Sequence, residues 1–294
     1  MVFDWVERLT YVFKRCIIKN RVEIAPITFN TKGDMTMSSK VIVTMTTKYP
    51  DFLGADSVRF DLALGVCQEA RQQGYEVVIA DASPDAVKRQ FEARGAHVFA
   101  QEDGMGPGRR QVWNEASCLV TADTRGILWT EEKPALIREV PSLVETMVRR
   151  KAKVLIPGRT QDAWQFYPSF QVQTEKVCLD VYNALFARGN ETFDPMFGPV
   201  LFCPSVLTYF SGETFSPGQW GLSDTYLQHW VPIYLRHLGM SVVSQDVPWE
   251  YPVEQRQQEE GPRLKDMLVH RLRQQGIFVS GYLKLHKLFS PLPY

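Results

Sequence analysis

The chain has 294 residues, of which 45% are hydrophobic, and this is enough for one large domain or two small ones with a continuous core. Lysine plus arginine number 33 and aspartate plus glutamate also number 33, so the formal charge is zero and no global field attracts nucleic acid or an anionic membrane. Any polyanionic ligand must therefore be held by a local site.

Residues 1–36 differ from the rest and are predicted to be an N-terminal extension. Apolar side chains recur at helical spacing from Val2 to Ile17, and basic side chains lie behind them. This pattern is compatible with membrane-surface contact through residues 1–21, with docking on the protein's own body, or with a loosely attached segment. No secretory signal or long apolar run is present in the sequence, so we expect a cytoplasmic protein.

From residue 40 onward, short β-branched runs alternate with helical patterns. The first half predicts strands at 40–47, 75–83, 96–101, 126–129 and 152–158, with helices at 57–74, 83–95, 108–122 and 140–151. Strands separated by helices imply right-handed crossovers and a mainly parallel sheet covered on both faces. We therefore predict an α/β fold whose ligands gather at the carboxyl ends of the strands.

The second half is less regular. It predicts a long helix at 168–189, a strand with a following turn at 197–210, a helix at 223–239, a strand leading into a turn at 240–252, a charged helix at 254–273 and an apolar-basic end at 276–290. Residues 37–253 are thus predicted to form the main domain and 254–294 a helical C-terminal tail.

A glycine-rich turn follows the third predicted strand. The segment "DGMGPGRR" (103–110) lacks the pattern of a dinucleotide or P-loop site, but it opens a helix with Arg109 and Arg110 in its first turn. Free backbone N–H groups and two guanidinium groups at one helix start would bind a diphosphate, and Asn114 faces the same side as Arg110. The alternative is that both arginines are ordinary solvated charges.

Two adjacent carboxylates follow the fourth predicted strand. Glu131 and Glu132 come where "GILW" breaks into a turn, so both can reach one cation, and Lys133 adds charge for a phosphate. Hard oxygen ligands of this type suit Mg²⁺ or Mn²⁺ bridging to substrate phosphates. The alternative is a surface turn with an internal Glu–Lys pair.

Four motifs in this order resemble the GT-A glycosyltransferases, in particular family-2-like nucleotide-sugar transferases. They are "VVIADASPD", "GMGPGRRQVWNEA", "WTEEKP" and "WGLSD" followed by a helix. The resemblance covers about residues 40–252, and it implies a nucleotide-binding α/β half and an acceptor-binding half. The family's D-x-D motif is replaced here by Thr130, Glu131 and Glu132, which bears directly on metal dependence.

The resemblance implies roles for individual residues. The donor, a UDP- or GDP-sugar, would be bound by Thr44, Asp81, Ser83, Arg109, Arg110, Asn114 and Lys133, and Mn²⁺ or Mg²⁺ by Glu131 and Glu132. The acceptor, which can be a small molecule, a glycan or a protein, would be bound by Arg159, Trp164, Tyr167 and Trp220. Asp224 would be the catalytic base if the reaction inverts, and the sequence leaves inversion or retention open.

Two other functions remain open on the sequence alone. A nucleotidyltransferase acting on a sugar phosphate uses a similar sheet, and a non-catalytic binding protein could keep the fold after losing the D-x-D motif. The oligomeric state is also left open.

Overall fold

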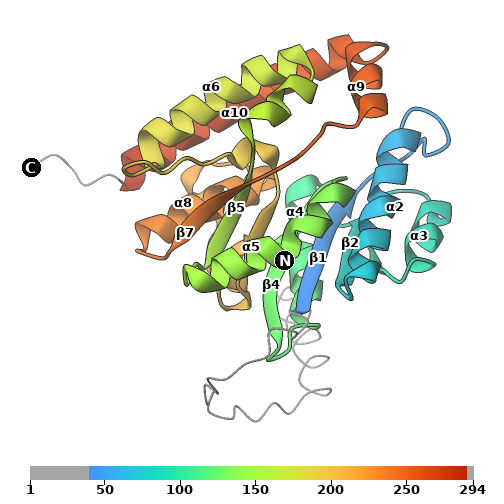
Figure 1. The fold of residues 1–294 in the computed structure, drawn as a ribbon, viewed down its shortest axis with the longest axis horizontal. Coiled ribbons are helices and arrows are strands. Elements are labelled where there is room, and N and C mark those ends of the chain that lie inside the picture. Colours follow the sequence, from blue (N-terminus) through green and yellow to red (C-terminus); the bar gives the residue numbers. More distant parts are fainter. Residues whose placement is uncertain (1–39, 290–294) are drawn as a thin grey trace, which may run out of the picture. The chain divides into compact units, whose positions relative to one another are not determined.

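Seven strands form one mixed sheet in the computed structural model, which describes residues 40–289 (Figure 1). Their order is β3-β2-β1-β4-β6-β5-β7, and all run parallel except β6, which is antiparallel to β4 and β5. The strands are β1 (Lys40–Thr47), β2 (Glu76–Asp81), β3 (His97–Ala100), β4 (Thr124–Trp129), β5 (Val154–Arg159), β6 (Val200–Phe202) and β7 (Val242–Val247). The predicted α/β fold with a mainly parallel sheet is confirmed.

Helices flank this sheet and connect its strands. The α-helices are α2 (Ser57–Gln72), α3 (Asp85–Glu92), α4 (Met105–Ser117), α5 (Pro134–Arg149), α6 (Ser169–Phe186), α7 (Leu207–Phe210), α8 (Leu227–His237), α9 (Val253–Glu260) and α10 (Leu264–Phe289). Short 3-10 helices lie at η1 (Gln161–Phe166), η2 (Pro195–Phe197), η3 (Pro204–Val206), η4 (Pro217–Trp220) and η5 (Asp224–Tyr226).

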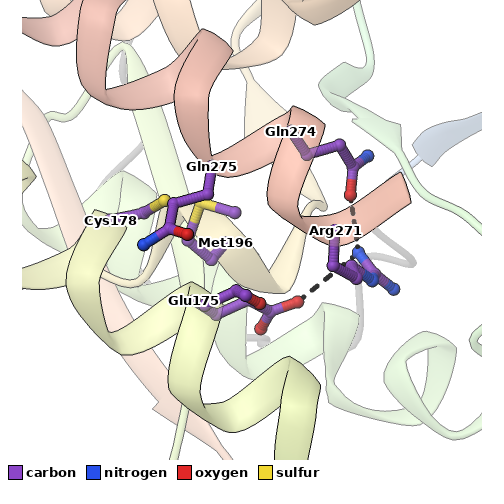
Figure 2. A pocket seen from close by; sticks show the side chains of 7 residues that line it. Glu175, Cys178, Met196, Arg271, Gln274 and Gln275 are labelled. Carbon is purple, nitrogen blue, oxygen red and sulfur yellow. Dashed lines mark hydrogen bonds and ion pairs between the residues drawn. The ribbon is translucent and has the colours of Figure 1, made fainter. Parts of the chain in front are cut away.

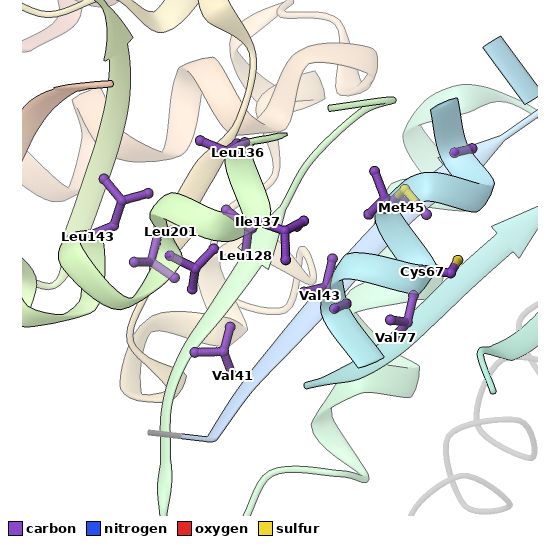
Figure 3. Packing of buried hydrophobic residues seen from close by; sticks show 14 of the residues in the cluster. Val41, Val43, Met45, Cys67, Val77, Leu128, Leu136, Ile137, Leu143 and Leu201 are labelled. Carbon is purple, nitrogen blue, oxygen red and sulfur yellow. The ribbon is translucent and has the colours of Figure 1, made fainter. Parts of the chain in front are cut away.

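The two faces of the sheet bury two hydrophobic clusters. Because successive strand residues point to opposite faces, Val41 and Val43 of β1 belong to one cluster and Ile42 to the other. The first cluster packs the sheet against α2, α3 and α5, and Figure 3 labels Val43 and Leu128 from the strands with Cys67 and Ile137 from the helices. The second packs the opposite face against α4, α7 and α8.

Two helices on the first half begin earlier than predicted. Helix α4 starts at Met105 rather than 108, so Gly106 lies inside its first turn, where a Cβ would come within 2.5 Å of the Asp224 Cβ. Glycine is needed there for close packing against η5. Helix α5 starts at Pro134 rather than 140, because proline at the first helical position sacrifices no hydrogen bond.

The strand with a following turn predicted for 197–210 is shorter and more helical in the structure. Only Val200–Phe202 form β6, and the rest becomes η2 before the strand and η3 and α7 after it. Pro204 ends the strand because it cannot donate a ladder hydrogen bond. The apolar run of this segment instead packs on the second cluster, where Phe202 stacks on Phe210 with ring centroids 3.9 Å apart.

The C-terminal part forms two helices rather than one charged helix and an apolar end. Helix α9 ends before Gly261 and Pro262, since the residue before proline is disfavoured in helical geometry. Helix α10 then runs continuously to Phe289 and lies alongside α6 (Figure 1).

Helix α10 is part of the packed core. Its Phe278, Tyr282 and Leu285 are buried in the second cluster. Gly281 meets Trp230 so closely that a Cβ would lie 2.5 Å from the indole ring. The residues predicted as a C-terminal tail therefore supply side chains to the interior.

The N-terminal extension at 1–36, with its predicted membrane contact, lies outside the described residues. Within residues 40–289, no helix combines the length and apolarity that a bilayer crossing requires.

Candidate functional site

The loop after β4 brings three of the predicted side chains to the carboxyl edge of the sheet. Thr130 continues the sheet by donating its N–H to the Thr44 carbonyl, and Glu131, Glu132 and Lys133 follow before Pro134 opens α5. This position, at the carboxyl ends of the adjacent parallel strands β1 and β4, is where parallel sheets commonly bind ligands.

Glu131 forms an ion pair within the loop. The Lys133 ammonium donates to the Glu131 carboxylate at 2.8 Å and lies 5.3 Å from the centre of the Phe197 ring. Burial opposes ionisation of Glu131, but the charges of Lys133 and then Arg109 outweigh it and lower the pKa to about 2. Glu131 is thus held as an anion beside two cations.

Glu132 turns toward α2 instead. Its Oε1 accepts hydrogen bonds from the Tyr49 hydroxyl at 2.8 Å and from Arg59 Nη2 at 2.6 Å. Burial first, and then the Glu132 charge, raise the pKa of Tyr49 well above its usual value. The pKa of Arg59 is also raised, chiefly by Glu132. This carboxylate anchors the loop to the segment that follows β1 and to α2.

The two carboxylates do not form a ready-made metal site. Each is paired with a different cation, and no group of three or more His, Cys, Asp or Glu side chains within residues 40–289 is placed to hold a metal ion. The residues therefore do not fit the predicted two-glutamate Mn²⁺ or Mg²⁺ site as they stand. The roles of Glu131 and Glu132 as metal ligands stay predictions.

Arg109 is buried in the interior behind this loop. Its guanidinium lies 4.5 Å from the centre of the Trp129 ring and 5.9 Å from that of Tyr226, and Nη1 donates to Gln228 Oε1 at 2.7 Å. Within the described part of the chain, its Nε has no hydrogen-bond partner and no carboxylate contacts it. Burial lowers the pKa to about 10, and the nearby charge of Glu131 limits this fall.

Arg110 points in another direction, toward the start of η5. Its Nη1 lies 2.6 Å from Asp224 Oδ2, so two predicted site residues from distant parts of the chain meet. Both side chains are partly exposed, while Asp224 Oδ1 is buried without a partner in the described residues. The expectation that Arg109 and Arg110 converge is wrong, and Asn114 lies exposed one turn beyond Arg110.

Three of the predicted donor-binding residues, Thr44, Asp81 and Ser83, form hydrogen bonds with other groups of the protein. Asp81 accepts from the Thr47 and Ser83 hydroxyls at 2.6 Å each and from the Ser83 N–H at 3.2 Å. Burial raises the pKa of Asp81, and these hydrogen bonds oppose the rise. The Thr44 hydroxyl donates to the Leu128 carbonyl at 3.0 Å, within the sheet. Their donor-binding roles stay predictions.

The predicted acceptor residues fall into two places. Arg159 is fully buried, with Nε and Nη2 on the Asp194 carboxylate at 2.6 and 2.8 Å and Nη1 on Glu175 at 2.6 Å. Its guanidinium stacks on Trp164 at 3.8 Å and lies 4.7 Å from the Tyr167 ring centre. Trp220 packs elsewhere, against the second hydrophobic cluster.

A small polar cavity lies between the loop after β4 and helices α6, α9 and α10. Its volume is about 60 Å³, and we call it the polar cavity. It is lined by Glu131, Glu132, Lys133, Arg159, Tyr167, Gln171, Glu175, Met196, Phe197, Trp249, Tyr251, Gln255 and Arg271. Five of the predicted site residues therefore border one space.

Several residues that line the polar cavity belong to no motif that the sequence shows. Arg271 reaches from α10 to Glu175 of α6 at 3.5 Å, as Figure 2 shows, and Gln171 donates to the same carboxylate at 2.7 Å. Arg271 sits in a run of charged residues and Glu175 in an ordinary amphipathic helix. Only the packing of α10 on α6 reveals their proximity.

The similarity of this chain to known proteins is confined to solved structures. No protein-family model and no curated protein sequence matches the chain. Among solved structures, one described as a nucleotide-diphospho-sugar transferase from Desulfovibrio desulfuricans G20 is 13% identical, with 84% of this chain and 99% of that chain covered and a TM-score of 0.40.

Two further structures are similar at the same level. The 4-diphosphocytidyl-2C-methyl-D-erythritol synthase from Anaerococcus prevotii is 11% identical, with 81% and 99% of the two chains covered and a TM-score of 0.41. Residues 1–349 of TarS from S. aureus are 11% identical, with 85% and 72% covered and a TM-score of 0.41. The TM-scores of these three structures are all below 0.5.

Proposed function

We propose that the protein is a glycosyltransferase that moves a sugar from a nucleotide-diphosphate-sugar donor to a hydroxyl group of an acceptor. The observation that carries this proposal is the buried guanidinium of Arg109, which no carboxylate of the described residues contacts. A buried charge is costly unless an anion compensates it. A donor diphosphate bound at this edge of the sheet is such an anion, and it forms charge-assisted hydrogen bonds with arginine.

The neighbouring side chains suit transfer of a sugar. Lys133 and Arg109 offset the negative charge that grows on the diphosphate as its bond to the sugar breaks. Asp224, oriented through Oδ2 by Arg110, accepts the proton of the acceptor hydroxyl in an inverting reaction. Arg109 is only 3% exposed and is covered by Tyr226 and Gln228, so the proposal requires these two side chains to move aside before a diphosphate can reach it.

A divalent cation remains part of this proposal only as a component to be tested. When bound, Mn²⁺ or Mg²⁺ would stabilise charge on the diphosphate, but Glu131 and Glu132 would first have to leave Lys133 and Arg59 in order to hold it. Because Lys133 and Arg109 already place positive charge near the proposed diphosphate site, nucleotide binding is measured with and without the metal.

One rival function is favoured by a specific observation. Glu132 is held by Arg59 and Tyr49, and Asp224 by Arg110, so carboxylates expected to act on ligands serve as internal anchors. This arrangement fits a non-catalytic binding protein. The two functions separate on turnover, since both bind nucleotide and only the transferase releases UDP or GDP from a sugar nucleotide.

The test is a calorimetric titration of UDP and GDP into the full chain, in Mn²⁺ and in EDTA. We expect Arg109→Met to weaken binding by roughly 10- to 100-fold, because a charge-assisted hydrogen bond contributes about 1.5–3 kcal/mol. Arg125→Met, at an exposed position of β4, is the matched control and keeps wild-type affinity. Absence of nucleotide binding in both conditions, or unchanged affinity in Arg109→Met, contradicts the proposal.

A second measurement separates transfer of a sugar from transfer of a nucleotide. Incubation with sugar nucleotides should release UDP or GDP. Pyrophosphate released from a sugar phosphate and a nucleoside triphosphate would instead identify a nucleotidyltransferase.

A further inference from the structure

The polar cavity has features that the donor site does not explain. It lies beside Glu131 and Lys133 but extends away from β1, toward α6, α9 and α10. We propose that it binds a small, neutral, polyhydroxylated molecule and that this molecule is the sugar acceptor. The acceptor role rests on the proposed transferase function, while binding itself does not.

The charges around the cavity favour a neutral ligand. The lining carries three cations, Lys133, Arg159 and Arg271, and three anions, Glu131, Glu132 and Glu175. Each cation has a carboxylate within 2.6 to 3.5 Å: Glu131 for Lys133, Glu175 for Arg159 and for Arg271. Because the ion pairs already compensate each other, an anionic or cationic ligand would have to break one of them.

Unpartnered polar atoms favour a ligand that carries hydroxyl groups. Three lining residues bury a polar atom that has no hydrogen-bond partner in the described residues: Oε1 of Gln171, Nε1 of Trp249 and Nε of Arg271. One is an acceptor and two are donors, and buried polar atoms left without partners destabilise the fold. A hydroxyl group both donates and accepts, so a polyol can satisfy atoms of either kind after small side-chain shifts.

Size and shape limit the ligand further. A cavity of about 60 Å³ exceeds the roughly 10–15 Å³ that one water needs but is far below the roughly 300–1,000 Å³ of common ligand pockets. It therefore suits a molecule of about glycerol size rather than a nucleotide. The rings of Tyr167, Trp249 and Tyr251 on its wall offer apolar faces for the C–H groups of such a molecule.

The experiment is saturation-transfer NMR on the full chain, with glycerol as the neutral ligand and glycerol 3-phosphate as its charged counterpart. We expect saturable binding of glycerol in the millimolar range and at least tenfold weaker binding of glycerol 3-phosphate. No saturable glycerol signal, or tighter binding of the phosphate, overturns the inference.

Matched variants locate the binding. Gln171→Leu and Trp249→Phe should each weaken glycerol binding by about tenfold, the effect expected for one lost hydrogen bond. Gln165→Leu, exposed on η1, and Trp113→Phe, buried in the second cluster, should leave it unchanged. Far-ultraviolet circular dichroism checks that all four variants are folded. Equal affinity across the four variants places binding outside the cavity and contradicts the inference.

Measuring glycerol binding and nucleotide binding separately distinguishes a failure of the cavity proposal from a failure of the proposed function. Nucleotide binding without glycerol binding overturns the cavity assignment and leaves the transferase proposal standing. Glycerol binding without nucleotide binding supports the cavity as a site and overturns its acceptor role.

Discussion

Asp224 of η5 and Arg110 of α4 form an ion pair, with Oδ2 of the carboxylate 2.6 Å from Nη1 of the guanidinium. The contact joins the first half of the chain to the second across the first turn of α4, where Gly106 leaves room for Asp224. It fixes the orientation of the one carboxylate that the sequence predicts as a catalytic base.

The first prediction concerns this pair. Asp224→Asn should lower kcat by about 10²- to 10⁴-fold, the usual contribution of a general base, if the enzyme inverts. Because both side chains are partly exposed, the free energy of unfolding should change by less than about 1 kcal/mol. Steady-state kinetics and urea unfolding measure the two effects. Near-normal turnover in Asp224→Asn would exclude it as the base.

Stability should depend strongly on the buried pair of Arg159 and Asp194. Asp194→Ala leaves the Arg159 guanidinium without its bidentate partner in the interior, and Asp194 also accepts from the Phe197 N–H at 3.1 Å. We expect a loss of about 3–5 kcal/mol in the free energy of unfolding. Urea unfolding measures it, with Asp162→Ala, at an exposed position of η1, as the control. A loss below 1 kcal/mol would show that Glu175 alone holds Arg159.

A pH dependence follows from His229. Burial, and then the charge of Arg109, lower its pKa from 6.5 to about 3, so the folded protein keeps this ring neutral where the unfolded chain protonates it. The unfolded state thus binds more protons between pH 6.5 and 3, and stability falls as the pH drops through that range.

The measurement compares wild type with His229→Gln. Urea unfolding from pH 8 to pH 4 should show an extra loss in wild type of up to about 1.4 kcal/mol per pH unit below 6.5. Above pH 7 the two curves should run parallel. Identical slopes below pH 6 would mean that His229 is protonated in the fold.

Two glycines of α10 provide a matched pair. Gly281→Ala places a Cβ 2.5 Å from the Trp230 ring and should destabilise the protein by about 1–3 kcal/mol, the usual cost of overpacking. Gly276→Ala meets no atom within 4 Å and should stabilise it by up to about 1 kcal/mol through helix propensity. Thermal unfolding measures both. Equal effects would mean that α10 is not packed on α8 in solution.

Periodicity predicts the fold of the first half well, because each strand and helix there has a continuous apolar pattern of its own. The strands at 40–47 and 126–129 and the crossover helices follow from local sequence. In the second half the predicted elements are wrong near Pro204 and Pro262. The chain leaves a regular element at both positions, because of packing and of proline geometry.

The site is predicted less well because side-chain direction depends on packing. Arg109 and Arg110 are neighbours in sequence, but consecutive helix positions point about 100° apart, so one is buried and the other meets Asp224. Glu131 and Glu132, in the loop after β4, also point to different partners, Lys133 and Arg59. Arg159 is paired with Glu175 and Asp194, and neither carboxylate lies in a recognisable motif.

Helix α10 has a consequence for synthesis of the protein. It supplies Arg271 to the cavity and Tyr282 to the interior, yet it is the last described element that a ribosome makes. Until it emerges, Trp230 and the neighbouring face of α6 stay open to water. The nascent chain can therefore build its sheet early, but it completes the lining of the polar cavity and covers the second cluster only after α10 has emerged, so a chain truncated before residue 264 should fold poorly.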